Sequence, residues 1–142
     1  LASKKQKKTE SLSKRDEEIY TWQKFDEDIE KIAQWAKDKN FKSVYGIPTG
    51  GLIPAVTLRN LLEIPQVLHK EDITKDTLIV DDISTTGRTI ERLLSFLGSG
   101  FRVATLCCNI DANKPDFFVR QTTKWVRFPW ETEKTSRYDG TV

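Results

Sequence analysis

Two neighbouring aspartates stand before a cluster of hydroxyl side chains in the middle of the chain. Asp81 and Asp82 end the apolar run 77–80, and the cluster that follows is Ser84, Thr85, Thr86, Gly87 and Thr89. Hydroxyl groups and the free backbone N–H groups at the start of a helix are donors that bind a phosphate. The carboxylates would repel that phosphate, so we expect them to hold a neutral diol or Mg²⁺ nearby. A phosphorylated sugar meets both demands.

A simpler interpretation makes one hydroxyl a helix cap and the aspartates a solvated strand end. A cap needs a single hydroxyl, whereas this segment has four beside two carboxylates. We therefore favour the phosphate site. A second turn, Pro48-Thr49-Gly50-Gly51, also lies between a predicted strand and a predicted helix.

The elements that would position these turns alternate along the chain. Apolar residues at helical spacing predict a helix that begins after a Thr21 cap and includes Trp22, Phe25, Ile29, Ile32, Ala33 and Ala36. Further helices are predicted over 52–62 and from Ile90 to Leu97, the latter closed by Gly98 and Gly100. Strand-like runs are 42–47, 64–68, 77–80, 101–108, 117–119 and 125–128.

This alternation is typical of an α/β fold, a doubly wound open parallel sheet with helices on both faces. Such sheets bind ligands beyond the carboxyl ends of their strands. Both glycine turns are expected at that edge.

Composition predicts one globular domain. The 142 residues are 37% hydrophobic and 31% charged. Residues 1–15 carry six basic side chains and one acidic one, whereas the rest carry 17 basic and 20 acidic ones. We expect a basic disordered tail over 1–17 and a single domain over 18–142. The body shows no nucleic-acid footprint; the tail could touch RNA or anionic lipid, although a solvated tail is the favoured interpretation.

Location and redox state follow from what the chain contains. No apolar run is long enough for a membrane span, and the basic start has no signal-peptide core, so we expect a soluble, cytoplasmic protein without a membrane partner. Two adjacent cysteines, Cys107 and Cys108, predict neither a disulfide framework nor a metal site.

Four segments resemble the type I phosphoribosyltransferases. LIVDDISTTGRT (78–89) is similar to their motif for 5-phosphoribosyl-1-pyrophosphate (PRPP), and VYGIPTGGLIPA (44–55) resembles their pyrophosphate loop. YTW (20–22) and WVRFPWE (125–131) resemble the ends of the xanthine-guanine and hypoxanthine type. The resemblance spans roughly residues 18–131.

The resemblance implies an enzyme of nucleotide salvage. It would transfer the phosphoribosyl group from PRPP to a nucleobase, with a 6-oxopurine favoured, and release a nucleoside monophosphate and pyrophosphate. Mg²⁺ is the implied cofactor, and a homo-oligomer is the implied assembly. The alternative is a non-catalytic regulator that binds PRPP or a nucleotide and uses the basic tail on RNA or a protein partner.

The resemblance also implies residue roles. Asp81 and Asp82 would hold the ribose hydroxyls, with Asp82 also near Mg²⁺. The 5-phosphate would lie on Ser84, Thr85, Thr86, Gly87, Arg88 and Thr89, and the pyrophosphate on the backbone of Thr49, Gly50 and Gly51. The base would meet Trp125, Val126 and Asn109, although Trp125 could equally be a core aromatic.

Several positions depart from the family pattern. Thr85 stands where 6-oxopurine enzymes commonly have an acid, Asn109 where they have a lysine, and Thr49 where a basic residue is common. Related enzymes also carry a long mobile lid where about eight residues remain here, between Leu68 and Thr77. Arg88 or Lys70 could supply the missing pyrophosphate contact. The shortened lid favours the regulator, whereas both functions need the aspartates and the phosphate turn.

Overall fold

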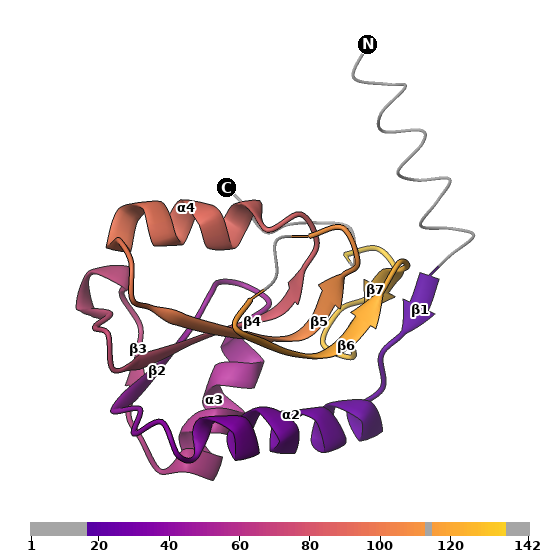
Figure 1. Ribbon diagram of the computed structural model, residues 1–142. Coiled ribbons are helices and arrows are strands. Elements are labelled where there is room, and N and C mark those ends of the chain that lie inside the picture. Colours follow the sequence, from indigo (N-terminus) through magenta and orange to yellow (C-terminus); the bar gives the residue numbers. More distant parts are fainter. Residues whose placement is uncertain (1–16, 113–114, 136–142) are drawn as a thin grey trace.

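A computed structural model describes residues 17–112 and 115–135 (Figure 1). In this part of the chain, five parallel strands form a sheet in the order β3-β2-β4-β5-β6, and a separate parallel pair joins β1 to β7. The strands are β1 (Glu17–Ile19), β2 (Ser43–Gly46), β3 (Gln66–Val67), β4 (Thr77–Ser84), β5 (Arg102–Asn109), β6 (Phe117–Thr122) and β7 (Trp125–Arg127).

Helices cover both faces of the sheet. α2 (Trp22–Ala36) and α3 (Leu52–Leu62) lie on one face and α4 (Arg88–Leu97) on the other, as Figure 1 shows. A 3-10 turn, η1 (Lys70–Asp72), connects β3 to β4. The predicted doubly wound parallel sheet is confirmed.

The helices form where their apolar spacing predicts them. At the start of α2, Thr21 Oγ1 accepts a hydrogen bond from the Lys24 N–H at 3.1 Å, so the predicted cap is in place. Phe25, Ile29 and Ile32 follow on the buried side of this helix. α4 ends at Gly98, whose φ of 96° lies in the region that favours glycine.

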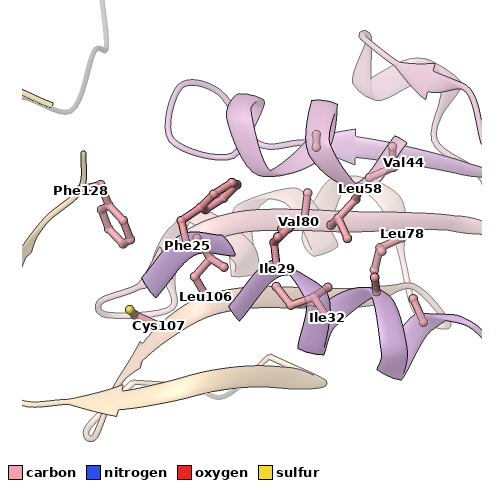
Figure 2. Packing of buried hydrophobic residues seen from close by; sticks show 14 of the residues in the cluster. Phe25, Ile29, Ile32, Val44, Leu58, Leu78, Val80, Leu106, Cys107 and Phe128 are labelled. Atoms are coloured by element: carbon pink, nitrogen blue, oxygen red, sulfur yellow. The ribbon is translucent and has the colours of Figure 1, made fainter. Parts of the chain in front are cut away.

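Apolar side chains pack on both faces of the central strands. On the α2 and α3 face, Ile29, Ile32 and Leu58 meet Val80 and Leu106 (Figure 2). On the α4 face, the buried cluster consists of Tyr45, Ile47, Ile73, Ile79, Ile90 and Val103. Because β2, β4 and β5 contribute to both clusters, their residues read as continuous apolar runs.

The two cysteines form no disulfide among the described residues and are buried next to each other on β5. Cys107 is 1% exposed and Cys108 is 0% exposed. Burial raises the pKa of the Cys107 thiol well above its ordinary value, with nearby acids such as Asp28 adding to the shift.

Two strands extend well beyond their predicted ends, and one strand was not predicted. β4 continues four residues past the apolar run, because Asp81 and Ser84 still pair with Thr105 and Cys108 of β5. β6 likewise extends to Thr122 beside Asn109. β1 was not predicted, and it forms only because Glu17, Glu18 and Ile19 pair with the distant β7.

The predicted tail, residues 1–17, falls almost entirely outside the described part of the chain. Residues 1–16 lie outside the described part, and β1 begins at Glu17, the last residue assigned to the tail. Residues 17–112 and 115–135 contain no helix long and apolar enough to cross a membrane.

Candidate active site

The two aspartates lie at the carboxyl end of β4, inside the sheet ladder. Asp81 is 7% exposed and Asp82 is 9% exposed. Asp81 Oδ1 accepts a hydrogen bond from the Asp82 N–H at 2.8 Å, and Asp82 Oδ1 accepts one from the Ile83 N–H at 2.7 Å. Each carboxylate is therefore fixed by the backbone of the next residue.

Burial makes ionisation of this pair unfavourable. Desolvation raises the pKa of Asp81 well above its ordinary value, and the negative charge of Asp82 raises it further. Desolvation also raises the pKa of Asp82, but hydrogen bonds from its surroundings oppose that shift. A positive charge or a hydroxyl donor placed against the pair would relieve this unfavourable state.

The predicted phosphate turn surrounds a cavity of about 70 Å³. Its lining comprises Asp81, Ile83, Ser84, Thr85, Thr86, Gly87, Thr89 and Ile90. One water needs only about 10–15 Å³ of such space, so the cavity has room for a phosphoryl group. Arg88 is exposed and does not line the cavity, but its backbone N–H donates to Thr86 Oγ1 at 3.3 Å.

The start of α4 opens onto this cavity. Gly87 precedes the helix with φ of 84°, a conformation that residues with a side chain rarely adopt. Gly87, the N-cap residue of α4, has no side chain to cap the helix, and the Arg88 N–H donates to Thr86 Oγ1. The positive end of the helix dipole and the remaining first-turn N–H groups would face an anion at this end.

The second glycine turn packs directly against the aspartates. A Cβ on Gly50 would overlap the Asp82 carboxylate, and one on Gly51 would overlap the Val80 carbonyl oxygen. The Ile47 N–H donates to the same Val80 oxygen at 2.9 Å, which ties the turn to β4. The peptide bond between Pro48 and Thr49 is cis. The two predicted anion turns are thus brought together.

The three residues predicted for the base do not line the phosphate cavity. Val126 is buried in β7, and the Trp125 indole nitrogen is buried with no hydrogen-bond partner among the described residues. Asn109 ends β5, and its Oδ1 accepts from the Asp111 N–H at 3.1 Å. Lys70 lies with its Nζ 4.6 Å from the Phe96 ring centroid, towards the other end of α4.

Two residues after β7 reach the aspartates and were not predicted to be functional. The Trp130 side chain lies close enough to Asp82 to lower the pKa of that carboxyl. Glu131 Oε1 accepts from the Phe128 N–H at 2.7 Å, and burial, with Asp82 and Glu17 nearby, raises the pKa of Glu131 to about 7. Both residues fall in the WVRFPWE segment, but no local spacing relates that segment to β4.

The chain was compared with protein-family models, curated proteins and solved structures. No protein-family model and no curated protein matches the chain. Among solved structures, a purine phosphoribosyltransferase from Pyrococcus horikoshii is 30% identical, with a TM-score of 0.70; the match covers 82% of this chain and 95% of that one. The chain belongs to the type I phosphoribosyltransferase family.

Two other solved structures share the fold of this phosphoribosyltransferase. A xanthine-guanine-hypoxanthine phosphoribosyltransferase from Helicobacter pylori is 20% identical, with a TM-score of 0.70, over 84% of this chain and 96% of that one. A hypothetical protein from Neisseria gonorrhoeae, solved with bound ppGpp, is 21% identical, with a TM-score of 0.69, over 84% of this chain and 91% of that one.

The site of this phosphoribosyltransferase suits a Mg²⁺ ion that is shared with its substrate. The described residues hold no group of three or more His, Cys, Asp or Glu side chains that could bind a metal alone. Mg²⁺ usually takes one or two carboxylates and completes its shell with water and substrate phosphates. The paired carboxylates of Asp81 and Asp82 fit that requirement.

Proposed function

We propose that this phosphoribosyltransferase transfers the 5-phosphoribosyl group of PRPP to a 6-oxopurine and releases pyrophosphate. The observation that carries the proposal is the arrangement at the end of β4. A phosphate-sized cavity at the start of α4 opens beside two buried carboxylates, and Gly50 lies against one of them. These features would receive the phosphate, the ribose and the pyrophosphate of PRPP in that order.

Each part of the site has a task in the reaction. Ser84, Thr86 and Thr89 bind the 5-phosphate together with the first N–H groups of α4. The carboxylates of Asp81 and Asp82 accept hydrogen bonds from the ribose hydroxyls. As the bond to pyrophosphate breaks, positive charge grows on the ribose, and the two carboxylates stabilise it.

The leaving pyrophosphate needs stabilisation of the opposite sign. The backbone of Thr49, Gly50 and Gly51 binds it, and its oxygens develop negative charge in the transition state. Asp82 would hold Mg²⁺, which when bound neutralises charge on the leaving group. No side chain forms a covalent bond with the sugar in this scheme.

The purine assignment rests on two similar solved structures and on the residues Trp125 and Val126 near the end of the chain. The 30% identical relative is a purine phosphoribosyltransferase, and the Helicobacter pylori protein is named for three 6-oxopurines. Trp125 and Val126 form the proposed wall of the base site, with Asn109 as a neutral donor or acceptor. We further propose a homo-oligomer that works in the cytoplasm, where free thiols such as Cys107 stay reduced.

A second candidate is a regulator that binds PRPP or a purine nucleotide without turning it over. Two observations favour it: Thr85 cannot act as a base at neutral pH, and only a short connection containing η1 links β3 to β4. The Neisseria gonorrhoeae protein with bound ppGpp shows that this fold can hold a guanine nucleotide.

A pyrophosphate-release assay separates the two candidates. Purified protein is given PRPP, Mg²⁺ and one of guanine, hypoxanthine, xanthine, adenine, orotate or uracil, with an Asp81→Asn/Asp82→Asn variant as the inactive control. We expect turnover with at least one of the first three bases. PRPP binding without turnover of any base would support the regulator, and turnover with orotate alone would exclude the purine assignment.

A further inference from the structure

The indole N–H of Trp130 is a buried donor without an acceptor. Among the described residues, its Nε1 has no hydrogen-bond partner of ordinary geometry, although the atom is shielded from water. Leaving a buried donor unpaired is unfavourable by about 1–3 kcal/mol. The same side chain lies near the Asp82 carboxylate and lowers the pKa of that group. The nearby acceptor is therefore a carboxylate of the candidate active site.

Aromatic packing holds the Trp130 ring in this place. The ring stacks on Phe128 with centroids 5.1 Å apart and planes at 6°. Phe25 meets its edge at 5.5 Å, and Trp22 lies 5.9 Å away at a steep angle. Since Phe25 and Trp22 belong to α2, the ring is fixed to the body of the domain and not only to the segment after β7.

The Asp82 carboxylate has little freedom on its other sides. The Ile83 N–H binds Oδ1 at 2.7 Å, and Gly50 approaches so closely that a Cβ there would overlap the carboxylate. An ordinary hydrogen bond with the indole would therefore form only when ligand contacts turn the carboxylate towards it.

We propose that Trp130 is a positioning residue for phosphoribosyl transfer: its indole N–H donates to the Asp82 carboxylate when PRPP binds and fixes that carboxylate towards the ribose hydroxyls. This role rests on the proposed function of Asp82. It makes the segment after β7 a working part of the ribose site and not only a wall for the base. It also assigns a partner to the buried indole donor.

The test compares Trp130→Phe with Trp35→Phe. Phenylalanine keeps a ring to stack on Phe128 but has no N–H. Trp35 is a matched control, because it stacks on Phe117 at 5.1 Å and 13° and does not line the phosphate cavity. Affinity for PRPP with Mg²⁺ is measured by calorimetry, and kcat and KM are measured separately wherever a base is turned over.

We expect Trp130→Phe to weaken PRPP binding by about tenfold or more, as for loss of a hydrogen bond to a charged group. Trp35→Phe should leave the affinity within about twofold. Affinity for PRPP that is equal in both variants overturns the positioning role. If the unmodified protein itself binds no PRPP, the proposed function fails and the role of Trp130 fails with it.

A measurement on the unmodified protein covers the case in which Trp130→Phe does not fold. The protein has four tryptophans, so its ¹⁵N-labelled spectrum holds four indole N–H signals to be assigned. PRPP with Mg²⁺ should move the Trp130 indole proton downfield and leave that of Trp35 in place. An unmoved Trp130 signal at saturating PRPP overturns the proposal.

Discussion

The Asp82 carboxylate is enclosed by a group of its own strand and by groups from two distant segments of the chain. Ile83 follows it in β4, Gly50 belongs to the turn after β2, and Trp130 follows β7. A group confined in this way has few orientations open to it, and electrostatic stabilisation of a transition state requires a well-defined one. Small changes in volume around it should therefore affect the reaction more than they affect folding.

Gly50→Ala tests this confinement. The added methyl group overlaps the Asp82 carboxylate and must displace it. We expect kcat/KM for PRPP to fall about 100-fold, the size of effect that a misplacement of about 1 Å can cause. Steady-state pyrophosphate release measures it.

Gly100→Ala serves as the control for Gly50→Ala. Its φ of 92° makes alanine unfavourable, but the new methyl group would meet only the Lys75 side chain, at 3.4 Å. We expect Gly100→Ala to lower stability by about 1 kcal/mol and to leave kcat/KM unchanged. Equal losses of kcat/KM in both variants would contradict the special role of Gly50.

Asp81→Asn should stabilise the folded protein. The pKa of Asp81 is raised by burial and by Asp82, so the folded state binds more protons than the unfolded state above the unfolded pKa of about 3.9. The free energy of unfolding therefore falls as pH rises through this window. Asparagine keeps the acceptor for the Asp82 N–H and removes the titration.

The stabilisation by Asp81→Asn should depend on pH. With divalent ions chelated, we expect Tm to rise by about 4 °C or more at pH 8, and by less at pH 5. Thermal unfolding followed by circular dichroism gives both values. A lower Tm at pH 8 would mean that the Asp81 charge has a structural role.

At the scale of elements, α4 begins beside the phosphate cavity with a glycine at positive φ. Gly87→Val puts a β-branched residue where φ is 84°, at the mouth of the cavity. We expect the fold to persist and protection by ribose 5-phosphate to vanish. In the unmodified protein, ligand at about 100 times its Kd should add about 2.7 kcal/mol of stability.

Gly98→Val is the matched control at the other end of α4. Gly98 has φ of 96° and open space around the position of a Cβ, so the backbone strain is similar but lies away from the cavity. Ribose 5-phosphate should still raise Tm in this variant. Loss of protection in both variants would show that general weakening of α4 is the cause.

An ionic contact between Asp28 and Arg120 links α2 to β6 at the edge of the sheet. Asp28 is fully buried on α2 and accepts hydrogen bonds from the Tyr20 hydroxyl and from Arg120 Nε of β6. Removing Asp28 leaves the buried Tyr20 hydroxyl without its acceptor, whereas the Arg120 side chain is 36% exposed and keeps Glu27 at 3.8 Å. We expect Asp28→Ala to lower the free energy of unfolding by about 1–3 kcal/mol in urea titrations.

The exposed Asp26→Ala, two residues earlier on the same helix, provides the comparison for Asp28→Ala. It should change stability by less than about 0.5 kcal/mol. If both changes were equally mild, the contact between Asp28 and Arg120 would contribute little to the fold.

At the scale of the whole molecule, one sheet joins the two apolar clusters. Trp22, Trp35 and Trp130 belong to the α2 side, whereas Tyr45, Ile73 and Ile90 lie on the α4 side. Because β2, β4 and β5 serve both sides, we expect the domain to unfold in one step. Tryptophan fluorescence and far-ultraviolet circular dichroism should then give the same urea midpoint.

Separate midpoints from these two signals would show that the α4 side can unfold alone. A useful comparison is the same pair of curves with saturating PRPP and Mg²⁺. Both midpoints should move together by the same amount if the ligand stabilises a single cooperative unit.

Most of the fold was predictable because local patterns agree with the tertiary structure. The Thr21 cap, the spacing of Phe25, Ile29 and Ile32, and the apolar run 77–80 each fix an element by themselves. The strand β1 was not predictable in this way, because its three residues depend on pairing with β7 more than 100 positions later.

In the candidate site too, the residues that are consecutive in the sequence were predictable and those brought together only by packing were not. The phosphate turn could be found from Asp81 to Thr89, since its residues are consecutive. Parallel strands that end at one edge of a sheet predict that Gly50 and Asp82 are neighbours. They do not predict that Gly50 lies in contact with the Asp82 carboxylate. The place of Trp130 could not be inferred, because only packing against α2 and Phe128 determines where that ring lies.

The buried thiols of Cys107 and Cys108 are internal reporters of how often the sheet opens. Because both are buried in β5, neither sulfur can react with a water-soluble disulfide reagent until the strand separates from its neighbours. The rate of labelling in native buffer therefore records how often the sheet opens. A metabolite bound at the end of β4, the strand beside them, should slow that modification even if it never touches sulfur.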